Sequence, residues 1–266
     1  MDIAIVYMVA GMSSRFGGKI KQFAKIGPDG ETLIEYSIKQ AVKAGFTKII
    51  FIVGSKTEEP FKKMFGNSYK KIPIEYVLQT YDPKERDRPW GTIDAICTIK
   101  DIIDCPFVIC NGDDIYGEKT FKILYEHLKN NKEEATIAYK LENVLPEQGE
   151  VNRGIFETQD DVVKNIREVF GITKENLSEK GLSSDSLCSM NIFGFHPEVV
   201  LKLNKILVEF KKKHKGDRKI EGLLPKEVSK LIKNKEIKMN LYPTSEKWFG
   251  VTNPEDEQKI REIIKN

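Results

Sequence analysis

Short apolar runs, each of the length of a buried strand and too short to span a membrane, alternate with amphipathic stretches along the first half of the chain. The strands expected from these runs cover residues 3–9, 48–53, 74–78 and 107–110. The helices expected from apolar residues at helical spacing cover residues 33–42, 58–65 and 91–103, with Thr32 as the N-cap of the first. Strands that alternate with helices in this way predict right-handed crossovers and a mostly parallel sheet.

The second half of the chain is richer in strands. Those expected cover residues 136–141, 154–157, 162–169, 189–195 and 237–242. Helices are expected over residues 197–212, 224–233 and 254–265. Because no linker of flexible composition separates the two halves, the pattern predicts a single α/β domain over residues 1–266, with a mixed, mostly parallel sheet flanked by helices.

Composition excludes two classes of partner. The chain has 43 basic and 40 acidic residues and a net charge of +3, which is too balanced for nucleic-acid binding through bulk electrostatics. No apolar run reaches membrane length and no basic leader precedes the first run, so we expect a cytoplasmic protein that binds no membrane. The four cysteines lack a C-x-x-C pair or zinc spacing, which favours free thiols in a reducing compartment.

A glycine-rich loop follows the first expected strand. It covers residues 11–18 with the sequence GMSSRFGG, and Lys21 and Gln22 come shortly after it. Small residues let the backbone approach a ligand closely, so that its N–H groups can contact phosphate oxygens. Arg15 and Lys21 add the positive charge that a polyphosphate requires. The Walker and Rossmann glycine patterns are both absent. A strand-to-helix turn without a ligand is the alternative interpretation.

Two acidic residues follow the strand expected at 107–110. The sequence there is Gly112-Asp113-Asp114, and the carboxyl ends of parallel strands are where α/β sheets place ligand-binding groups. Mg²⁺ binds oxygen ligands and typically takes one or two protein carboxylates together with phosphates and water. The turn is therefore a candidate Mg²⁺ site, although an aspartate that only caps the end of a strand is the alternative.

The glycine-rich loop carries a resemblance to a known family. Val9-Ala10-Gly11-Met12-Ser13-Ser14-Arg15, followed by Lys21-Gln22-Phe23, resembles the signature of the nucleotidyltransferases that join a nucleoside triphosphate to a sugar 1-phosphate. The resemblance covers nearly the whole chain. It implies a Rossmann-like, GT-A-like domain with a nucleotide-binding half (1–130) and a sugar-binding half (131–266). It also implies that a sugar 1-phosphate oxygen attacks the α-phosphorus and that pyrophosphate leaves.

The resemblance implies roles for particular residues. Arg15 would bind the β- and γ-phosphates, Lys21 would contact the α-phosphate or the attacking phosphate, and Asp113 would bind Mg²⁺. The other nucleotide-binding residues implied are Ala10, Gly11, Met12, Ser13, Ser14, Gln79, Gly91 and Thr92. The sugar-binding residues implied are Asp114, Gly154, Glu168 and Asn191. A second metal ligand falls at Gly250 or Thr252, depending on how the segment KWFGVT is aligned, and Thr252 is the candidate with a side-chain oxygen.

The site motifs are most similar to those of short UDP-N-acetylglucosamine pyrophosphorylases. UTP and N-acetylglucosamine 1-phosphate are therefore the expected substrates, since the Gln79 amide can match the N3–H donor of uracil. A homodimer is the one assembly considered. Residues 81–88 are inserted between Gln79 and Gly91, and Trp90 either stacks on the base or packs against the sheet. Thymidylyl or cytidylyl transfer to another phosphorylated acceptor is one alternative. A glycosyltransferase and a non-catalytic nucleotide-sugar binding subunit are alternatives of other classes.

Overall fold

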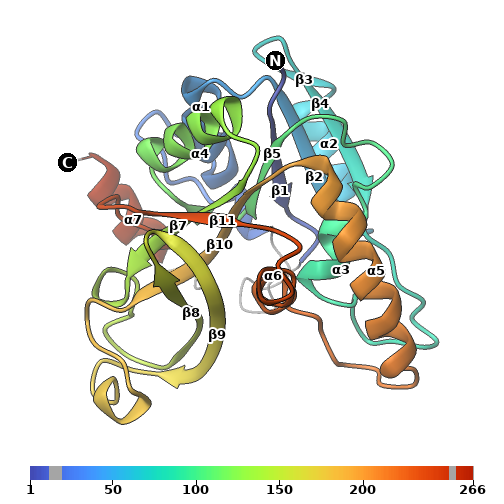
Figure 1. Ribbon diagram of the computed structural model, residues 1–266. Helices are drawn as coiled ribbons and strands as arrows, with labels where there is room; N and C mark the ends of the chain where they lie inside the picture. The colour runs from blue at the N-terminus through green and yellow to red at the C-terminus, as the bar shows by residue number, and fades with distance from the viewer. Residues whose placement is uncertain (12–19, 252–255, 266) are drawn as a thin grey trace.

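A ten-stranded sheet forms the centre of the protein, whose computed structural model describes residues 1–11, 20–251 and 256–265 (Figure 1). The strand order is β3-β4-β2-β1-β5-β10-β7-β11-β9-β8. These strands are β1 (Ala4–Met8), β2 (Lys48–Val53), β3 (Ser68–Tyr69), β4 (Ile72–Leu78), β5 (Phe107–Asn111), β7 (Glu134–Lys140), β8 (Val151–Gln159), β9 (Val162–Ile172), β10 (Leu187–Phe195) and β11 (Met239–Pro243). A second, two-stranded sheet pairs β6 (Asp114–Ile115) with β12 (Phe249–Gly250).

Helices are distributed along the whole chain. They are α1 (Leu33–Ala44), α2 (Glu58–Phe65), α3 (Thr92–Cys97), α4 (Glu118–Asn130), α5 (Pro197–Lys213), α6 (Leu224–Lys233) and α7 (Asp256–Lys265). Short 3-10 turns cover Lys21–Phe23, Leu141–Asn143 and Ser178–Lys180. Within the part of the chain that the structure describes, no helix is both long enough and apolar enough to cross a membrane.

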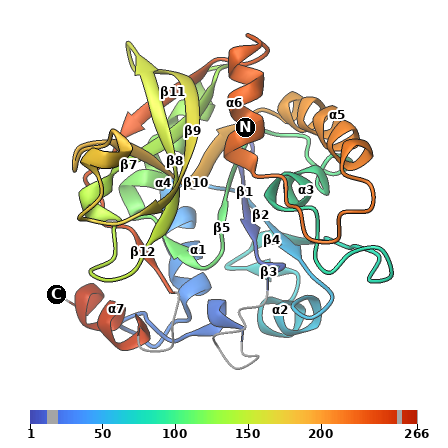
Figure 2. The same cartoon turned by 90° about the horizontal axis from the view of Figure 1, so that it is seen from below.

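The strand directions make the sheet mixed. Strands β4, β2, β1 and β5 are parallel neighbours, β10 lies antiparallel between β5 and β7, and β11 is parallel to β7. Strands β4, β2, β1, β5, β7 and β11 therefore run in the same direction. In the second half, β8 pairs with both β9 and β10, so that the β8–β9 hairpin curls over this end of the sheet (Figure 2). The prediction of a single α/β domain with a mixed sheet flanked by helices is confirmed. The parallel pairs that were expected are found among β4, β2, β1 and β5 and between β7 and β11, whereas the other pairs within the ten-stranded sheet are antiparallel.

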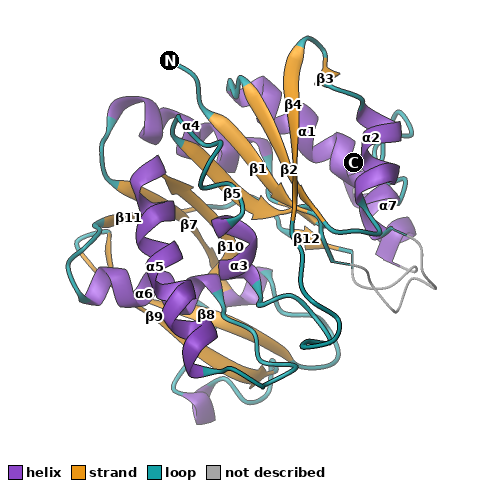
Figure 3. Cartoon of the chain, turned by 90° about the vertical axis from the view of Figure 1, so that its right-hand side faces the viewer, coloured by secondary structure: helices purple, strands orange, loops and turns teal. Residues whose placement is uncertain are grey.

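The central strands are buried on both faces. In β1, Ile5 and Tyr7 belong to a core formed with α1, α2 and α4. Ala4 and Val6 belong to the core on the opposite face, with α3, α5 and α6, which lie together on one side of the sheet (Figure 3). Strands covered on both faces appear in a sequence as continuous apolar runs, which is why residues 3–9 show no alternation.

Helix α4 was not predicted from the sequence, in which no helix was expected over residues 118–130. Its buried Phe121, Leu124 and Leu128 do have helical spacing, so the signal was present. The helix packs against α1 and β7 and covers the same face of the sheet as α1 and α2.

Helix α3 is shorter than the helix expected over residues 91–103, because it ends at Cys97. After Cys97, backbone N–H groups bond to the carbonyl three residues back, which is the pattern of tight turns. Ile99 and Ile103 are nevertheless buried in the core with α5 and α6. The apolar spacing thus continues beyond the helix itself.

Thr32 caps α1, as expected. Its Oγ1 accepts a hydrogen bond from the Glu35 N–H (3.3 Å), and the Glu35 carboxylate accepts one from the Thr32 N–H (2.8 Å), which completes a capping box. Replacing Thr32 with alanine is expected to lower the free energy of unfolding by about 1 kcal/mol, measured by urea denaturation. Thr32→Ser retains the hydroxyl and serves as the control. An equal loss in both variants would contradict the role of the cap.

Candidate active site

A cavity of about 890 Å³ opens where several parallel strands end. Its walls follow the carboxyl ends of β1, β2, β4 and β5, the edge at which α/β sheets place ligand-binding groups. The expected nucleotide-binding residues that line it are Ala10, Gly11, Gln79, Gly91 and Thr92. The others, Met12, Ser13 and Ser14, lie outside the described residues, as does Arg15. The structure therefore brings together residues from two separate stretches of the sequence.

The loop after β2 also lines this cavity, and it was not among the residues expected there. It contributes Gly54, Ser55 and Lys56. A Cβ atom on Gly54 would lie 2.7 Å from the Ala10 carbonyl oxygen, so only glycine lets the two loops approach this closely. The Gly54 N–H donates to Thr57 Oγ1 (2.9 Å), which fixes the turn. The available signal was the sequence Gly-Ser-Lys-Thr directly after a buried strand.

Only glycine fits at position 91, because of the backbone conformation there and the close approach of Gly222. Its φ is +95°, and a Cβ atom there would lie 2.5 Å from the Gly222 carbonyl oxygen. The same carbonyl accepts a hydrogen bond from the Ile93 N–H (3.2 Å). Thr92 Oγ1 accepts one from the Leu224 N–H (2.8 Å) at the start of α6. The turn that lines the cavity is thus held against the segment before α6.

Gln79 is buried at the end of β4, and both of its amide hydrogens have partners. Nε2 donates to the Gly91 carbonyl oxygen (3.2 Å) and to Asp94 Oδ2 (2.9 Å). The other oxygen of Asp94 accepts a hydrogen bond from Lys211 Nζ (2.6 Å) on α5. Neither Asp94 nor Lys211 was predicted as a site residue, because their link to Gln79 depends on packing between α3 and α5.

Arg86 anchors the inserted segment 81–88 to the rest of the protein. It is 3% exposed, and its Nη1 and Nη2 donate to the carbonyl oxygens of Asp217 (2.6 Å) and Ile220 (2.5 Å). Its Nε donates to the Arg88 carbonyl oxygen (3.0 Å). One buried guanidinium thus satisfies backbone acceptors from two loops and shapes the outer wall of the cavity.

Trp90 packs against protein and is not among the residues that line the cavity. The Arg86 guanidinium lies 3.5 Å from its ring centroid, a cation–π contact, and Phe210 meets it edge-on at 6.1 Å. Of the two interpretations of Trp90, this arrangement supports packing against the fold.

Arg86→Met is expected to lower the free energy of unfolding by about 2–3 kcal/mol, because it leaves buried carbonyl oxygens without donors. Arg167→Met is the matched control, since the Arg167 side chain is 45% exposed and pairs with Glu157 on the surface. Urea denaturation of the two variants measures the difference. Equal, small effects would show that Arg86 does not anchor the inserted segment.

Lys21 and Asp113 form an ion pair, although 92 positions separate them in the sequence. Lys21 lies in the 3-10 turn after the glycine-rich loop, and Asp113 follows β5. Their side chains are 20% and 21% exposed, so both are accessible to a ligand. The expected phosphate-binding cation and the expected metal ligand are therefore in direct contact.

The segment around β12 lies beside this acidic turn. The Val251 N–H donates to the Asp113 carbonyl oxygen (3.3 Å), and Gly250 pairs with Asp114 across β6 and β12. A Cβ atom on Gly250 would lie 3.0 Å from Asp114 Oδ1. Gly250 itself offers no side-chain ligand, and Thr252 lies outside the described residues.

Asp114 is buried behind Asp113 in a polar network. Its Oδ2 accepts hydrogen bonds from Asn111 Nδ2 (2.8 Å) and the Tyr116 hydroxyl (3.2 Å). Burial, and after it the charge of Asp113, raises the pKa of the Asp114 carboxyl. Asn111 Oδ1 accepts a hydrogen bond from Asn191 Nδ2 (2.7 Å). Asn111 lines the cavity and links two of the expected sugar-binding residues, yet it was not predicted.

The remaining expected sugar-binding residues lie on the β8–β9 hairpin. Gly154 and Glu168 are cross-strand partners. A Cβ atom on Gly154 would lie 2.9 Å from Ile166 and 3.2 Å from Glu168 Oε1, so this glycine makes room for side chains of β9. Glu168 is half-buried; burial raises the pKa of its carboxyl, against the lowering by Lys226 and Arg153. The sugar-binding roles of these residues remain predictions.

The donors at the acidic turn fit a hard cation. Among the described residues, no three His, Cys, Asp or Glu side chains converge on one point. Asp113 and Asp114 are consecutive residues shortly after the end of β5, with the Asp113 carboxylate accessible and the Asp114 carboxylate buried. One or two carboxylates, completed by phosphate oxygens and water, form the typical protein share of a Mg²⁺ site.

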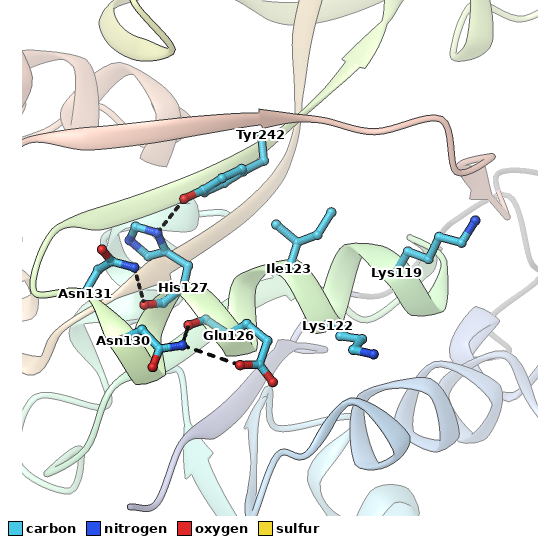
Figure 4. Close-up of a pocket in the computed structure, with 8 residues that line it drawn as sticks. All are labelled: Lys119, Lys122, Ile123, Glu126, His127, Asn130, Asn131 and Tyr242. Atoms are coloured by element: carbon cyan, nitrogen blue, oxygen red, sulfur yellow. Dashed lines mark hydrogen bonds between the residues drawn. The ribbon is translucent and has the colours of Figure 1, made fainter.

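A second cavity, of about 580 Å³, lies along α4 and is lined by Ile123, His127 and Tyr242 among others (Figure 4). His127 Nδ1 is hydrogen-bonded to the Tyr242 hydroxyl (2.9 Å), and Nε2 to the Glu133 carbonyl oxygen (2.8 Å). Both ring nitrogens of this histidine are therefore satisfied within the protein.

Comparison with known families gives one match over most of the chain. The model of a family described as nucleotidyl transferase matches residues 18–257. No curated protein sequence matches the chain.

Solved structures share the fold across the full length. A Bacillus anthracis protein assigned as a glucose-1-phosphate thymidylyltransferase is 13% identical, with a TM-score of 0.71 over 99% of this chain and 96% of its own. A UDP-glucose pyrophosphorylase complexed with UDP-glucose is 17% identical (TM-score 0.68, 99% and 98%). The inositol-1-phosphate CTP transferase from T. maritima is 14% identical (TM-score 0.70, 100% and 95%). At these identities the likeness establishes the fold.

Proposed function

This chain belongs to the nucleotidyl transferase family, and we propose that it transfers a nucleotidyl group from a nucleoside triphosphate to a sugar 1-phosphate, with release of pyrophosphate. The observation that carries the proposal is the contact between Lys21 and Asp113, two residues after Asn111, which lines the cavity at the strand ends. This contact places the lysine expected to bind phosphate next to the carboxylate expected to bind a metal ion.

The proposed reaction depends on placing two anionic reactants in line. An oxygen of the sugar 1-phosphate attacks the α-phosphorus, the bond to the β-phosphate breaks, and pyrophosphate leaves with the electron pair. Positioning and neutralisation of charge account for most of the catalysis in such transfers. Lys21 is proposed to supply positive charge at the α-phosphate or the attacking phosphate, and Gly11, which lines the cavity, to offer its backbone N–H to the triphosphate. Arg15 is proposed to hold the β- and γ-phosphates.

Mg²⁺ is the proposed cofactor, with Asp113 as its ligand, Asp114 as the alternative to Asp113, and Thr252 as the candidate for a second ligand. When bound, the ion would neutralise charge on the phosphate oxygens. The buried network of Asn111 and Tyr116 holds Asp114 in place behind Asp113. This arrangement fixes the acidic turn before any substrate binds.

UTP is the proposed nucleotide and N-acetylglucosamine 1-phosphate the proposed acceptor. Gln79 and the turn at Gly91 and Thr92 border the cavity where a base would enter. Glu168, half-buried and flanked by the cations Lys226 and Arg153, is suited to accept hydrogen bonds from sugar hydroxyls. The similar proteins named above transfer thymidylyl and cytidylyl groups or bind UDP-glucose, so other bases and acceptors are the alternative.

Pyrophosphate release tests the proposal. The purified protein is incubated with Mg²⁺, each of UTP, dTTP, CTP, ATP and GTP, and a panel of sugar 1-phosphates. We expect the fastest release with UTP and N-acetylglucosamine 1-phosphate. Release with another pair would retain nucleotidyl transfer and change the substrate. A parallel incubation with nucleotide sugars is the counter-test: release of a nucleoside diphosphate there, with no pyrophosphate from any pair above, would favour a glycosyltransferase and overturn the proposal.

A further inference from the structure

The side-chain amide of Gln79 has a single stable orientation. The oxygen and nitrogen of an amide are distinguished by their hydrogen-bonding partners. Nε2 faces the Gly91 carbonyl oxygen (3.2 Å) and Asp94 Oδ2 (2.9 Å), and both of these atoms accept hydrogen bonds. A flipped amide would place Oε1 against two acceptors in a buried site. Both amide hydrogens are therefore used inside the protein, and the polar atom that the Gln79 side chain can offer a ligand is its carbonyl oxygen, Oε1.

Asp94 fixes the orientation of the Gln79 amide. Its side chain is 7% exposed, so it is an acceptor held out of water. Lys211 Nζ donates to Oδ1 at 2.6 Å, which leaves Oδ2 for Gln79. Both oxygens of Asp94 therefore accept hydrogen bonds, one from Lys211 and the other from Gln79. The orientation of the Gln79 amide is thus set by Asp94 on α3, which is itself held by Lys211 on α5.

The orientation of the Gln79 amide determines which nucleobases it can pair with. Uracil and thymine carry a hydrogen on N3, whereas cytosine carries a lone pair there. A carbonyl oxygen facing N3 forms a hydrogen bond with uracil or thymine and meets a second acceptor in cytosine. An unpaired buried acceptor disfavours the wrong base by about tenfold or more.

We propose that Asp94 and Lys211 are positioning residues that fix Gln79 as an acceptor, and that they thereby select uracil or thymine nucleotides over cytosine nucleotides. This inference rests on the proposed nucleotide site. It adds two residues that do not contact the base themselves and act on it only through Gln79.

The test is the ratio of dissociation constants for CTP and UTP, measured by titration calorimetry with Mg²⁺ and no acceptor, so that no turnover is needed. In the wild-type protein we expect UTP to bind more tightly. Asp94→Asn offers an amide donor to Gln79 and permits the flipped orientation, so the ratio is expected to fall about tenfold. Lys211→Met is expected to lower the ratio in the same direction by a smaller factor. If Asp94→Asn does not fold, Lys211→Met decides alone.

Exposed neighbours provide matched controls. Asp101→Asn and Lys212→Met remove the same charges from exposed positions close by and should leave the ratio unchanged. A ratio within twofold of wild type in Asp94→Asn, or in Lys211→Met if that variant decides alone, would overturn the inference, as would a wild-type preference for CTP; nucleotidyl transfer would stand in both cases. Failure of the wild type to bind any nucleoside triphosphate would overturn the nucleotide site itself.

Discussion

Replacing Lys21 with alanine is expected to lower kcat by about 100- to 1,000-fold, because one fixed positive charge is lost where charge develops on the phosphates. Lys21 is 20% exposed and already pairs with Asp113, so its ammonium group is held at the acidic turn before substrate binds. Initial rates of pyrophosphate release, at saturating nucleotide and acceptor, measure the effect.

Lys25→Ala is the matched control for Lys21. It lies four residues further along, is exposed, and should leave kcat within about twofold of wild type. The stability of Lys21→Ala should remain within about 1 kcal/mol of wild type, since Asp113 keeps access to water. If Lys21→Ala were as active as Lys25→Ala, the proposed mechanism would be wrong.

Asp113→Asn is expected to lower kcat by about 1,000-fold and to raise the Mg²⁺ concentration needed for half-maximal rate. An amide has the shape of the carboxylate but lacks the charge that attracts a hard cation. Loss of a metal ion from a phosphoryl-transfer site costs several kcal/mol of stabilisation in the transition state. Rates measured across a series of MgCl₂ concentrations separate weaker metal binding from slower chemistry.

Asp101→Asn is the control, because it makes the same change on the surface after α3. A chelator should abolish the wild-type rate, and added Mg²⁺ should restore it. If Asp113→Asn shows the wild-type Mg²⁺ dependence, the metal ligand lies elsewhere and Asp114 becomes the first candidate.

Where the local sequence alone determines a helix or strand, its predicted first and last residues agree with the structure. The strand at Lys48–Val53 and the helices at Glu58–Phe65 and Leu224–Lys233 have the predicted limits. In each, apolar spacing and the residues that begin or end the element agree, so nearby residues alone determine the result. The capping box at Thr32 is of the same kind, because its partners are three residues apart.

Other features needed contacts between distant residues. Arg86 lies in an inserted segment with no pattern of its own, and its partners are 131 and 134 positions away. Many exposed arginines have a similar local sequence. Only the packing of two loops around one guanidinium distinguishes this residue from them.

The sequence by itself determined the alternation of strands and helices, the glycine-rich loop with Arg15 and Lys21, and the acidic turn at Asp113, because each depends on residues close together in the chain. Only the tertiary structure decided which distant groups meet. It brought Lys21 to Asp113 and Asn111 to Asn191, and it placed Lys211 against Asp94, 117 positions away. Local propensity specifies elements, whereas the pairing of side chains follows from how those elements pack around the buried sheet.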